Sequence, residues 1–173
     1  MSLHSGYLTG RQLSIWDLLR KGHSQSDIAR RLHITRQAVS QLAQTIPDKV
    51  SAALYDAARL NRIDPRHVDS VRGVLLGWSK EFQAETIITF SSRTGLNLWY
   101  QHELGRCRIC PDKGRCRAAL LENAKEFGIA LNKAEKEQDP SKLSGLIFAK
   151  LLGPAYSPRI NSIEAPNAKM ASA

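Results

Sequence analysis

The alternation of apolar and polar positions predicts three short helices over residues 9–47. Thr9, Ser24 and Thr35 each precede an apolar series at helical spacing, and each carries a side-chain oxygen that can cap a helix. The first helix is expected to run to about Lys21. The expected buried faces are Leu13, Trp16 and Leu19 in the first helix, Ile28, Ala29 and Leu32 in the second, and Ala38, Val39, Leu42 and Ile46 in the third.

Only His33 and Ile34 separate the second and third helices, a spacing typical of a helix-turn-helix. The third helix, which Pro47 is expected to end, carries arginine and glutamine on its outward side. These residue types read base edges in the DNA major groove, whereas a solvated helix more often carries glutamate and lysine. We therefore expect a recognition helix, and the alternative is an ordinary helical hairpin whose polar residues face water. The residues expected to contact DNA are Thr35, Arg36, Gln37, Ser40, Gln41 and Gln44, together with Ser24, Gln25 and Arg11.

Residues 48–61 predict a further helix with one apolar side. That side is formed by Val50, Ala53, Leu54, Ala57 and Leu60. It is expected to pack either on the carboxy-terminal half of the chain or on the same helix of a second copy. Because operators are commonly palindromic, the second arrangement predicts a homodimer.

A strand pattern begins near Val71. The runs 74–76, 86–90 and 96–100 are aliphatic, β-branched or alternating, and residues 91–95 have turn chemistry. We expect a small antiparallel sheet that supplies the core of a second domain. The alternative is a sheet that senses a ligand through Trp78, Trp99 or Tyr100. Helices are expected over residues 118–131 and 139–153.

The three cysteines of the chain, Cys107, Cys110 and Cys116, have the spacing C-x2-C-x5-C. Three thiolates this close repel one another unless a cation neutralises them, which favours a metal site over thiols that are neighbours by chance. Structural zinc would normally require a second cysteine or histidine pair, whereas an iron–sulfur cubane suits three thiolates and one other ligand. His102 is the nearest candidate for that ligand, and Glu103, Asp112, a small external ligand or a second subunit are the others. Basic residues expected to lower the thiol pKa values, or else to contact DNA phosphates, are Arg106, Arg108, Lys113, Arg115 and Arg117.

Composition points to a polyanionic partner, because the net charge is +9 and the pI is about 9.8. Double-stranded DNA is the expected partner. An anionic membrane is the rival, but no apolar run reaches the roughly 18 residues needed to span one, and the amino terminus lacks a signal-peptide pattern. We therefore expect a cytoplasmic protein. Three cysteines also cannot pair completely into a disulfide framework.

Two stretches resemble known families. The first is similar to archaeal Tfx-type DNA-binding proteins and to the broader LuxR and sigma-region-4 helix-turn-helix group, which implies DNA binding. It departs at His33, where many members carry glycine, although histidine tolerates a left-handed conformation to some extent. The matching residues are Leu8-Thr9-Gly10-Arg11-Gln12, Arg20-Lys21-Gly22, Ser24-Gln25, Asp27-Ile28-Ala29, Leu32 and Thr35-Arg36-Gln37-Ala38-Val39-Ser40.

The second stretch, CRICPDKGRCRAALLENA, is similar to the C-x2-C-P-x4-C segment of WhiB-like iron–sulfur regulators. This resemblance implies a [4Fe–4S] cluster on Cys107, Cys110 and Cys116. The chain lacks the separate upstream cysteine of the WhiB-like pattern.

These patterns together predict an α+β fold. We expect a three-helix helix-turn-helix domain over residues 1–47 and a linker or dimerisation helix over 48–62. A sensor domain with the small antiparallel sheet, the cysteine loop and further helices is expected over 63–153, followed by a flexible tail over 154–173.

The preferred function is a transcription regulator that senses redox state, oxygen, nitric oxide or iron through a [4Fe–4S] cluster. A change in the cluster would alter the spacing of two recognition helices in a dimer. RNA polymerase or another transcription protein is a further candidate partner. One alternative retains DNA binding with a purely structural zinc ion. The other is an iron–sulfur enzyme with a DNA-targeting module, but neither paired carboxylates nor a nucleophile with its base supports it, so no enzyme is expected.

Overall fold

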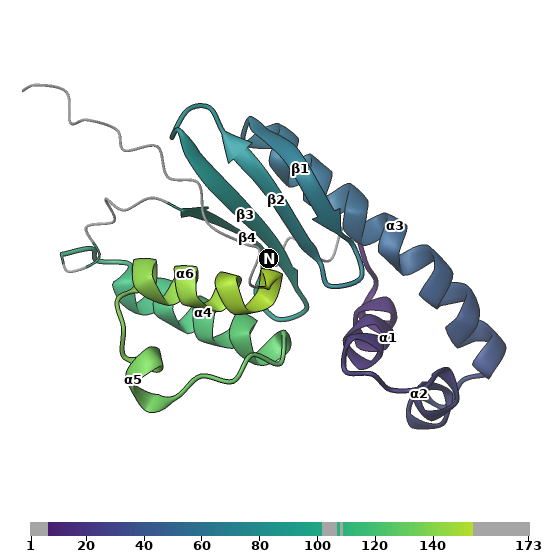
Figure 1. Ribbon diagram of the computed structural model, residues 1–173. Helices are drawn as coiled ribbons and strands as arrows, with labels where there is room; N and C mark the ends of the chain where they lie inside the picture. Colours follow the sequence, from purple (N-terminus) through teal and green to yellow (C-terminus); the bar gives the residue numbers. More distant parts are fainter. Residues whose placement is uncertain (1–6, 102–106, 108, 154–173) are drawn as a thin grey trace, which may run out of the picture.

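The computed structural model describes residues 7–101, 107 and 109–153 (Figure 1). Its first part contains the helices α1 (Gly10–Arg20), α2 (Gln25–Leu32) and α3 (Arg36–Leu60). α1 begins as predicted at Thr9, where the Thr9 hydroxyl accepts from the Gln12 amide at 3.3 Å and the Gln12 side chain accepts from the Thr9 amide at 3.0 Å. The buried face of α1 includes Ile15, which the sequence pattern did not identify, beside the predicted Trp16.

Pro47 lies inside α3 and does not end it, so the prediction of a separate helix over 48–62 is wrong. A proline in a helix interior removes one backbone hydrogen bond and costs about 3 kcal/mol. The side chains of Ile46, Val50 and Leu54, on both sides of the proline, are completely buried. Each such burial contributes about 1.5–3 kcal/mol. Their combined burial outweighs the proline penalty, and α3 continues as a single helix of 25 residues.

A four-stranded antiparallel meander follows α3, with the strands in the order β1-β2-β3-β4. Strands β2, β3 and β4 match the three predicted runs, whereas β1 was not predicted. β1 contains Pro65, and its register with β2 shifts between Pro65 and His67. An edge strand tolerates a proline because one of its sides has no strand partner. The bounds are Ile63–Asp69 for β1, Val74–Ser79 for β2, Ala84–Ser91 for β3 and Gly95–Gln101 for β4.

Three helices follow the sheet. α4 spans Lys113–Glu126, α5 spans Lys133–Lys136 and α6 spans Pro140–Leu152. α6 agrees with the predicted helix, but α4 begins before residue 118 and ends before residue 131. The earlier start places Cys116 in the first turn of α4. The predicted tail, 154–173, lies outside the described residues.

Alternation along the strands gives the sheet two apolar faces. Leu75 and Ile88 face α3 in one core, which also contains Trp16 of α1. Their neighbours Val74 and Ile87 face α4 and α6 in a second core. The sheet therefore lies between α3 on one side and α4 with α6 on the other (Figure 1). This arrangement confirms the predicted α+β class.

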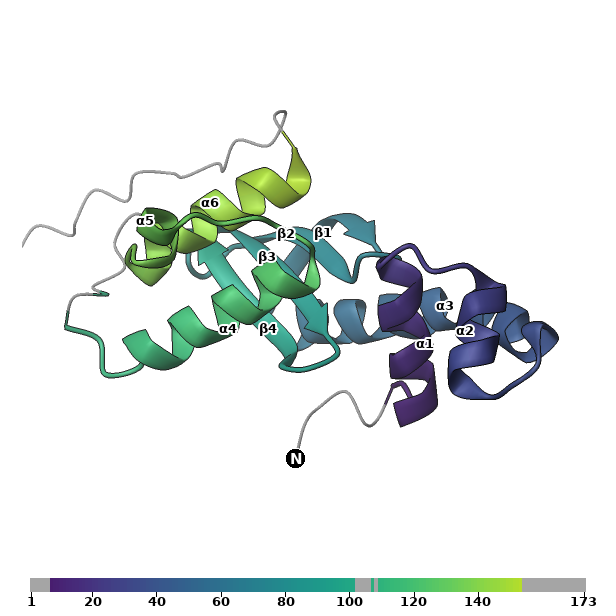
Figure 2. The ribbon, with the colours of Figure 1, turned by 90° about the horizontal axis from the view of Figure 1, so that it is seen from below.

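The helices α1 and α2 gather at the amino-terminal end of α3, whereas the rest of α3 runs along the sheet (Figure 2). The first turns of α3 therefore project beyond the sheet, beside α2. Among the residues that the structure describes, no helix is long and apolar enough to cross a membrane.

Candidate nucleic-acid interface and cysteine segment

The helices α2 and α3 both begin at side-chain caps. The Ser24 hydroxyl accepts a hydrogen bond from the Asp27 amide at 3.1 Å, and the Thr35 hydroxyl accepts one from the Ala38 amide at 3.1 Å. These bonds satisfy amides that the first turn of a helix leaves without a partner. Both caps are at the positions predicted from the sequence, and they fix where each helix starts.

The turn between α2 and α3 depends on His33. Its backbone is left-handed, with φ 52° and ψ 47°. This conformation reverses the chain within two residues, and the Ile34 amide then donates to the carbonyl of Ala29 at 3.0 Å. Histidine here occupies a conformation that glycine adopts at lower cost.

Small and apolar side chains hold α2 against α3 beneath the candidate interface. Ile28 and Val39 have no exposed surface, and Ala29 is 7% exposed. These residues belong to the core that includes Ile15 and Trp16 of α1. The amino-terminal part of α3 therefore has one face fixed in the core and the opposite face directed to solvent.

The predicted DNA-contact residues lie at the surface. Ser40 and Gln25 are half-buried, and the others are exposed: Arg11, Ser24, Thr35, Arg36, Gln37, Gln41 and Gln44. Eight of these nine residues lie on α2, on the first turns of α3 or at their caps. Arg11 belongs to α1.

Three arginines on these helices have side chains available for a polyanion. Arg11, Arg31 and Arg36 are exposed and form no ion pair within the described residues. Arg30, by contrast, pairs with Asp27. The Ser24 hydroxyl and this arginine hold the pKa of the Asp27 carboxyl below its usual value. Arg31 was not among the predicted contacts, although its position on α2 beside the recognition face makes it a phosphate-contact candidate.

The cysteine segment is described only in part. Cys107 and Cys116 are half-buried, Cys110 is exposed, and all three are free thiols. Burial raises the pKa of the Cys116 thiol, and the nearby Cys110, Asp112 and Cys107 raise it further. Arg115 lowers the pKa of Cys116, as expected of a flanking basic residue, but its effect is weaker than these and the pKa remains raised.

Most of the described basic residues near the cysteines bind other partners. Lys113 pairs with Asp139 at 2.5 Å, and Arg115 pairs with Asp112 at 2.9 Å. Arg117 donates to the carbonyls of residues 137 and 138 at 3.1 and 3.0 Å. These contacts hold the start of α4 against the chain that leads into α6. Arg106 and Arg108 lie outside the described residues.

The described thiols do not by themselves provide a ligand set for a metal. Cys107, Cys110 and Cys116 are close enough for the first two to affect the pKa of the third. Yet within residues 7–101, 107 and 109–153, no group of three or more His, Cys, Asp or Glu side chains is arranged to hold a metal ion. His102 and Glu103 lie outside the described residues. The described donors thus do not by themselves form a metal centre, and the predicted [4Fe–4S] or zinc site stays a prediction.

The aromatic residues of the sheet have internal partners. The Trp99 indole N–H donates to the Thr89 hydroxyl at 3.2 Å, and its ring lies 6.2 Å from that of Phe148 on α6. The ring centroids of Tyr100 and Phe82 lie 4.6 Å apart. Packing within the protein accounts for these two side chains.

A buried ionic cluster joins α1 to α4. Arg20, near the end of α1, donates to the carboxylate of Glu126 at 2.9 Å, and both side chains are at most 5% exposed. The Ser92 amide donates to the same carboxylate at 2.8 Å, and the hydroxyls of Ser91 and Ser92 also donate to it. The Arg20 guanidinium lies 3.9 Å from the Trp16 ring centroid. Local sequence patterns do not predict this cluster, since the two charged residues are 106 positions apart.

Comparison with known proteins adds no assignment to these sites. No protein-family model, no curated protein and no solved structure matches the chain. The candidate interface therefore has to be judged from its own geometry.

Proposed function

We propose that the chain is a sequence-specific transcription regulator that binds double-stranded DNA through a helix-turn-helix formed by α2 and the first turns of α3. One observation carries the proposal. After the left-handed turn at His33, a capped helix presents exposed Arg36, Gln37, Gln41 and Gln44 while its opposite face is fixed in the core.

The side chains on this face suit direct readout of bases. Arginine forms paired hydrogen bonds with guanine, and glutamine does so with adenine, each contact contributing about 1–3 kcal/mol of discrimination. Arg36 and Gln37 lie in the first turn of α3, the part of a recognition helix that reaches base edges. Arg11 and Arg31 are placed on the flanking helices, where they would contact phosphates. The net charge of +9 supports such a complex.

The test is selection of binding sites from a randomised DNA library, followed by affinity measurements on the selected sequence by fluorescence anisotropy. The double variant Arg36→Ala, Gln37→Ala is expected to lose about 30-fold or more in affinity for the selected site, since two contacts of about 1–3 kcal/mol each are removed. Arg59→Ala is the matched control, because Arg59 is an exposed arginine on the distal half of the same helix.

Two outcomes would reject the recognition face. One is a library that shows no enrichment, and the other is a double variant that binds the selected site as tightly as the wild type. Arg31→Ala gives a separate reading. The variant is expected to weaken binding to selected and to random DNA alike, since a phosphate contact carries no sequence information. It should also reduce the slope of log affinity against log salt concentration by about 1.

A second proposal concerns the signal. The cysteine segment leads directly into α4, and its free thiols support a redox- or metal-responsive segment. α4 carries Cys116 in its first turn and Glu126 at its end, where Glu126 binds Arg20 of α1. A rearrangement at the cysteines would thus reach the DNA-binding helices through α4.

Metal analysis after anaerobic purification tests this second proposal. Iron with a brown colour supports a [4Fe–4S] cluster, zinc in a colourless protein supports a structural ion, and Cys110→Ser is expected to lower the metal content. A metal-free protein whose DNA affinity is the same with reduced and oxidised thiols would reject it. Size-exclusion chromatography with light scattering tests the homodimer.

A further inference from the structure

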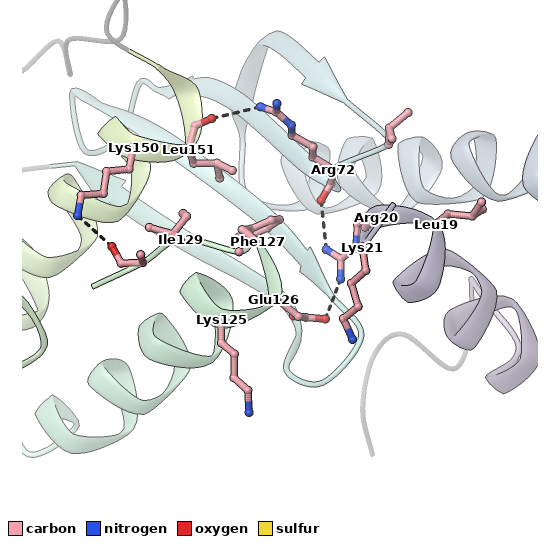
Figure 3. A pocket seen from close by; sticks show the side chains of 13 residues that line it. Leu19, Arg20, Lys21, Arg72, Lys125, Glu126, Phe127, Ile129, Lys150 and Leu151 are labelled. Atoms are coloured by element: carbon pink, nitrogen blue, oxygen red, sulfur yellow. Dashed lines mark hydrogen bonds and ion pairs between the residues drawn. The ribbon is translucent and has the colours of Figure 1, made fainter. Parts of the chain in front are cut away.

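A pocket opens where α1 meets the carboxy-terminal helices. It has a volume of about 990 Å³. Its walls come from the end of α1, the β1–β2 turn, residues 125–130 at and after the end of α4, and the end of α6 (Figure 3). This volume is at the upper end of the range of small-molecule sites. Neither DNA contact nor the cysteine segment uses this pocket.

One part of the pocket surface is apolar. Leu19, Phe127 and Ile129 line it and are half-buried, and Leu151 is 9% exposed. Val71 also lines the pocket, and 61% of its surface is exposed. An aliphatic side chain this exposed beside other apolar walls gains free energy when a ligand covers it. The walls therefore favour a ligand with a hydrocarbon or aromatic part.

The other part of the surface is cationic. Lys21, Arg72, Lys125 and Lys150 line the pocket together with Arg20. The single lining carboxylate, Glu126, is already bound by Arg20 and by the amide and hydroxyl of Ser92. Lys125 is exposed and forms no ion pair within the residues that the structure describes (Figure 3). The other lining cations already have partners: Lys21 pairs with Asp17, Arg72 with Asp69 and Lys150 with Glu135. Lys125 is therefore the lining cation whose charge is available to an anionic ligand.

Arg20 is a further pocket-lining cation, and its hydrogen bonding is incomplete. Its side chain is 5% exposed, and its Nε is buried without a hydrogen-bond acceptor. A buried donor left unpaired costs about 1–3 kcal/mol. The rest of the guanidinium is already bound by Glu126, by Asp17 and by the carbonyl of Arg72, so Arg20 closes this side of the pocket.

We propose that this pocket binds a small amphipathic organic anion. The apolar part of the ligand lies against Phe127, Ile129 and Val71, and its acid group pairs with Lys125. Such a ligand bridges α1 and α4. The proposal does not depend on DNA binding, so its failure and the failure of the proposed function are distinguishable.

Two fluorescent probes test it directly. Anilinonaphthalene sulfonate is an apolar aromatic anion, and phenylnaphthylamine is its uncharged counterpart. Titration of the full chain is expected to show saturable binding of one equivalent of the sulfonate. The uncharged probe is expected to bind about tenfold more weakly, and added salt is expected to weaken only the sulfonate.

Matched variants locate the binding. Lys125→Glu and Lys142→Glu change the net charge equally, and both lysines are exposed on helices, but only Lys125 lines the pocket. Lys125→Glu is expected to weaken the sulfonate about tenfold, whereas Lys142→Glu leaves it unchanged. Val71→Asp is expected to weaken both probes, because it places a charge on the apolar wall. Equal affinities for Lys125→Glu and Lys142→Glu, or equal binding of the two probes, would overturn the proposal. Circular dichroism of each variant verifies that the protein is folded.

Discussion

The carboxylate of Glu126 holds three separate parts of the chain together, and its removal should be strongly destabilising. Glu126→Gln retains the size of the side chain but removes its charge. The Arg20 guanidinium, 5% exposed, then retains only the more distant carboxylate of Asp17, at 3.6 Å, as a counter-ion. The Ser92 amide and the hydroxyls of Ser91 and Ser92 also lose an ionised acceptor.

The magnitude follows from this burial. Breaking a buried ion pair by neutralising one partner typically costs about 3–5 kcal/mol, because the other charge remains buried and uncompensated. An exposed pair contributes at most about 1 kcal/mol. Glu122 supplies that comparison, since it lies one turn earlier on α4 and pairs at 2.7 Å with Arg93, whose side chain is 59% exposed. We expect Glu126→Gln to lower the free energy of unfolding by about 3–5 kcal/mol, and Glu122→Gln by less than about 1 kcal/mol.

Urea unfolding followed by circular dichroism measures both values. Equal slopes of the unfolding free energy against urea for all three proteins would show that the transition remains comparable. A loss below about 1 kcal/mol for Glu126→Gln would refute the reasoning, because the buried pair would then contribute no more than an exposed one.

Three further predictions concern other parts of the fold. Tyr7 donates to Asp56 at 2.9 Å; this bond and Arg59 lower the pKa of Asp56, while burial and Asp56 raise that of Tyr7. The contribution of the Asp56 carboxyl to stability is therefore present above pH about 4 and is lost as the pH falls through its folded pKa. The contribution of the Tyr7 phenol is present below pH about 10 and is lost as the pH rises through the folded pKa of Tyr7. Tyr7→Phe should then be closest to wild type in stability below pH about 4 and above pH about 10. A difference in stability between the two proteins that stays constant across pH in thermal unfolding would disprove the linkage. Gly77→Ala should destabilise the β1–β2 pairing by about 1–3 kcal/mol in urea unfolding, because a Cβ there would lie 2.8 Å from a carbonyl oxygen of β1; an unchanged midpoint would contradict this. Pro47→Ala should raise the unfolding free energy by about 1–3 kcal/mol in the same assay, because it restores a helix hydrogen bond, and a lower value would show that the proline is accommodated without strain.

Local chemistry explains why the helix starts could be predicted. A cap depends on a side-chain oxygen and an amide three residues later, so Ser24 and Thr35 carry the whole signal within one turn. The outward face of α3 follows from the same periodicity, because the residues opposite Val39 must face solvent once that side chain is buried. The α+β class follows similarly, because the spacing of apolar positions changes from a helical to a strand pattern after residue 70.

The misses come from tertiary packing that local patterns do not contain. Pro47 is a strong stop signal in isolation, but the buried neighbours Ile46 and Val50 keep α3 continuous. β1 lacks strand chemistry around Pro65 and forms because β2 offers a partner. The pocket beside Arg20 could not be predicted either, since its walls come from four parts of the chain that only the packed fold brings together.

The same packing changes how the cysteine segment relates to the candidate DNA interface. Along the chain, the whole sheet lies between α3 and the cysteine segment. In the fold, α4 runs from Cys116 in its first turn to Glu126 at its end, and Glu126 binds Arg20 of α1. Trp16 of α1 packs in the core that holds Val39 of α3. One helix, one buried ion pair and one shared core therefore connect Cys116 to the candidate DNA interface, and Glu126→Gln is the variant expected to uncouple them.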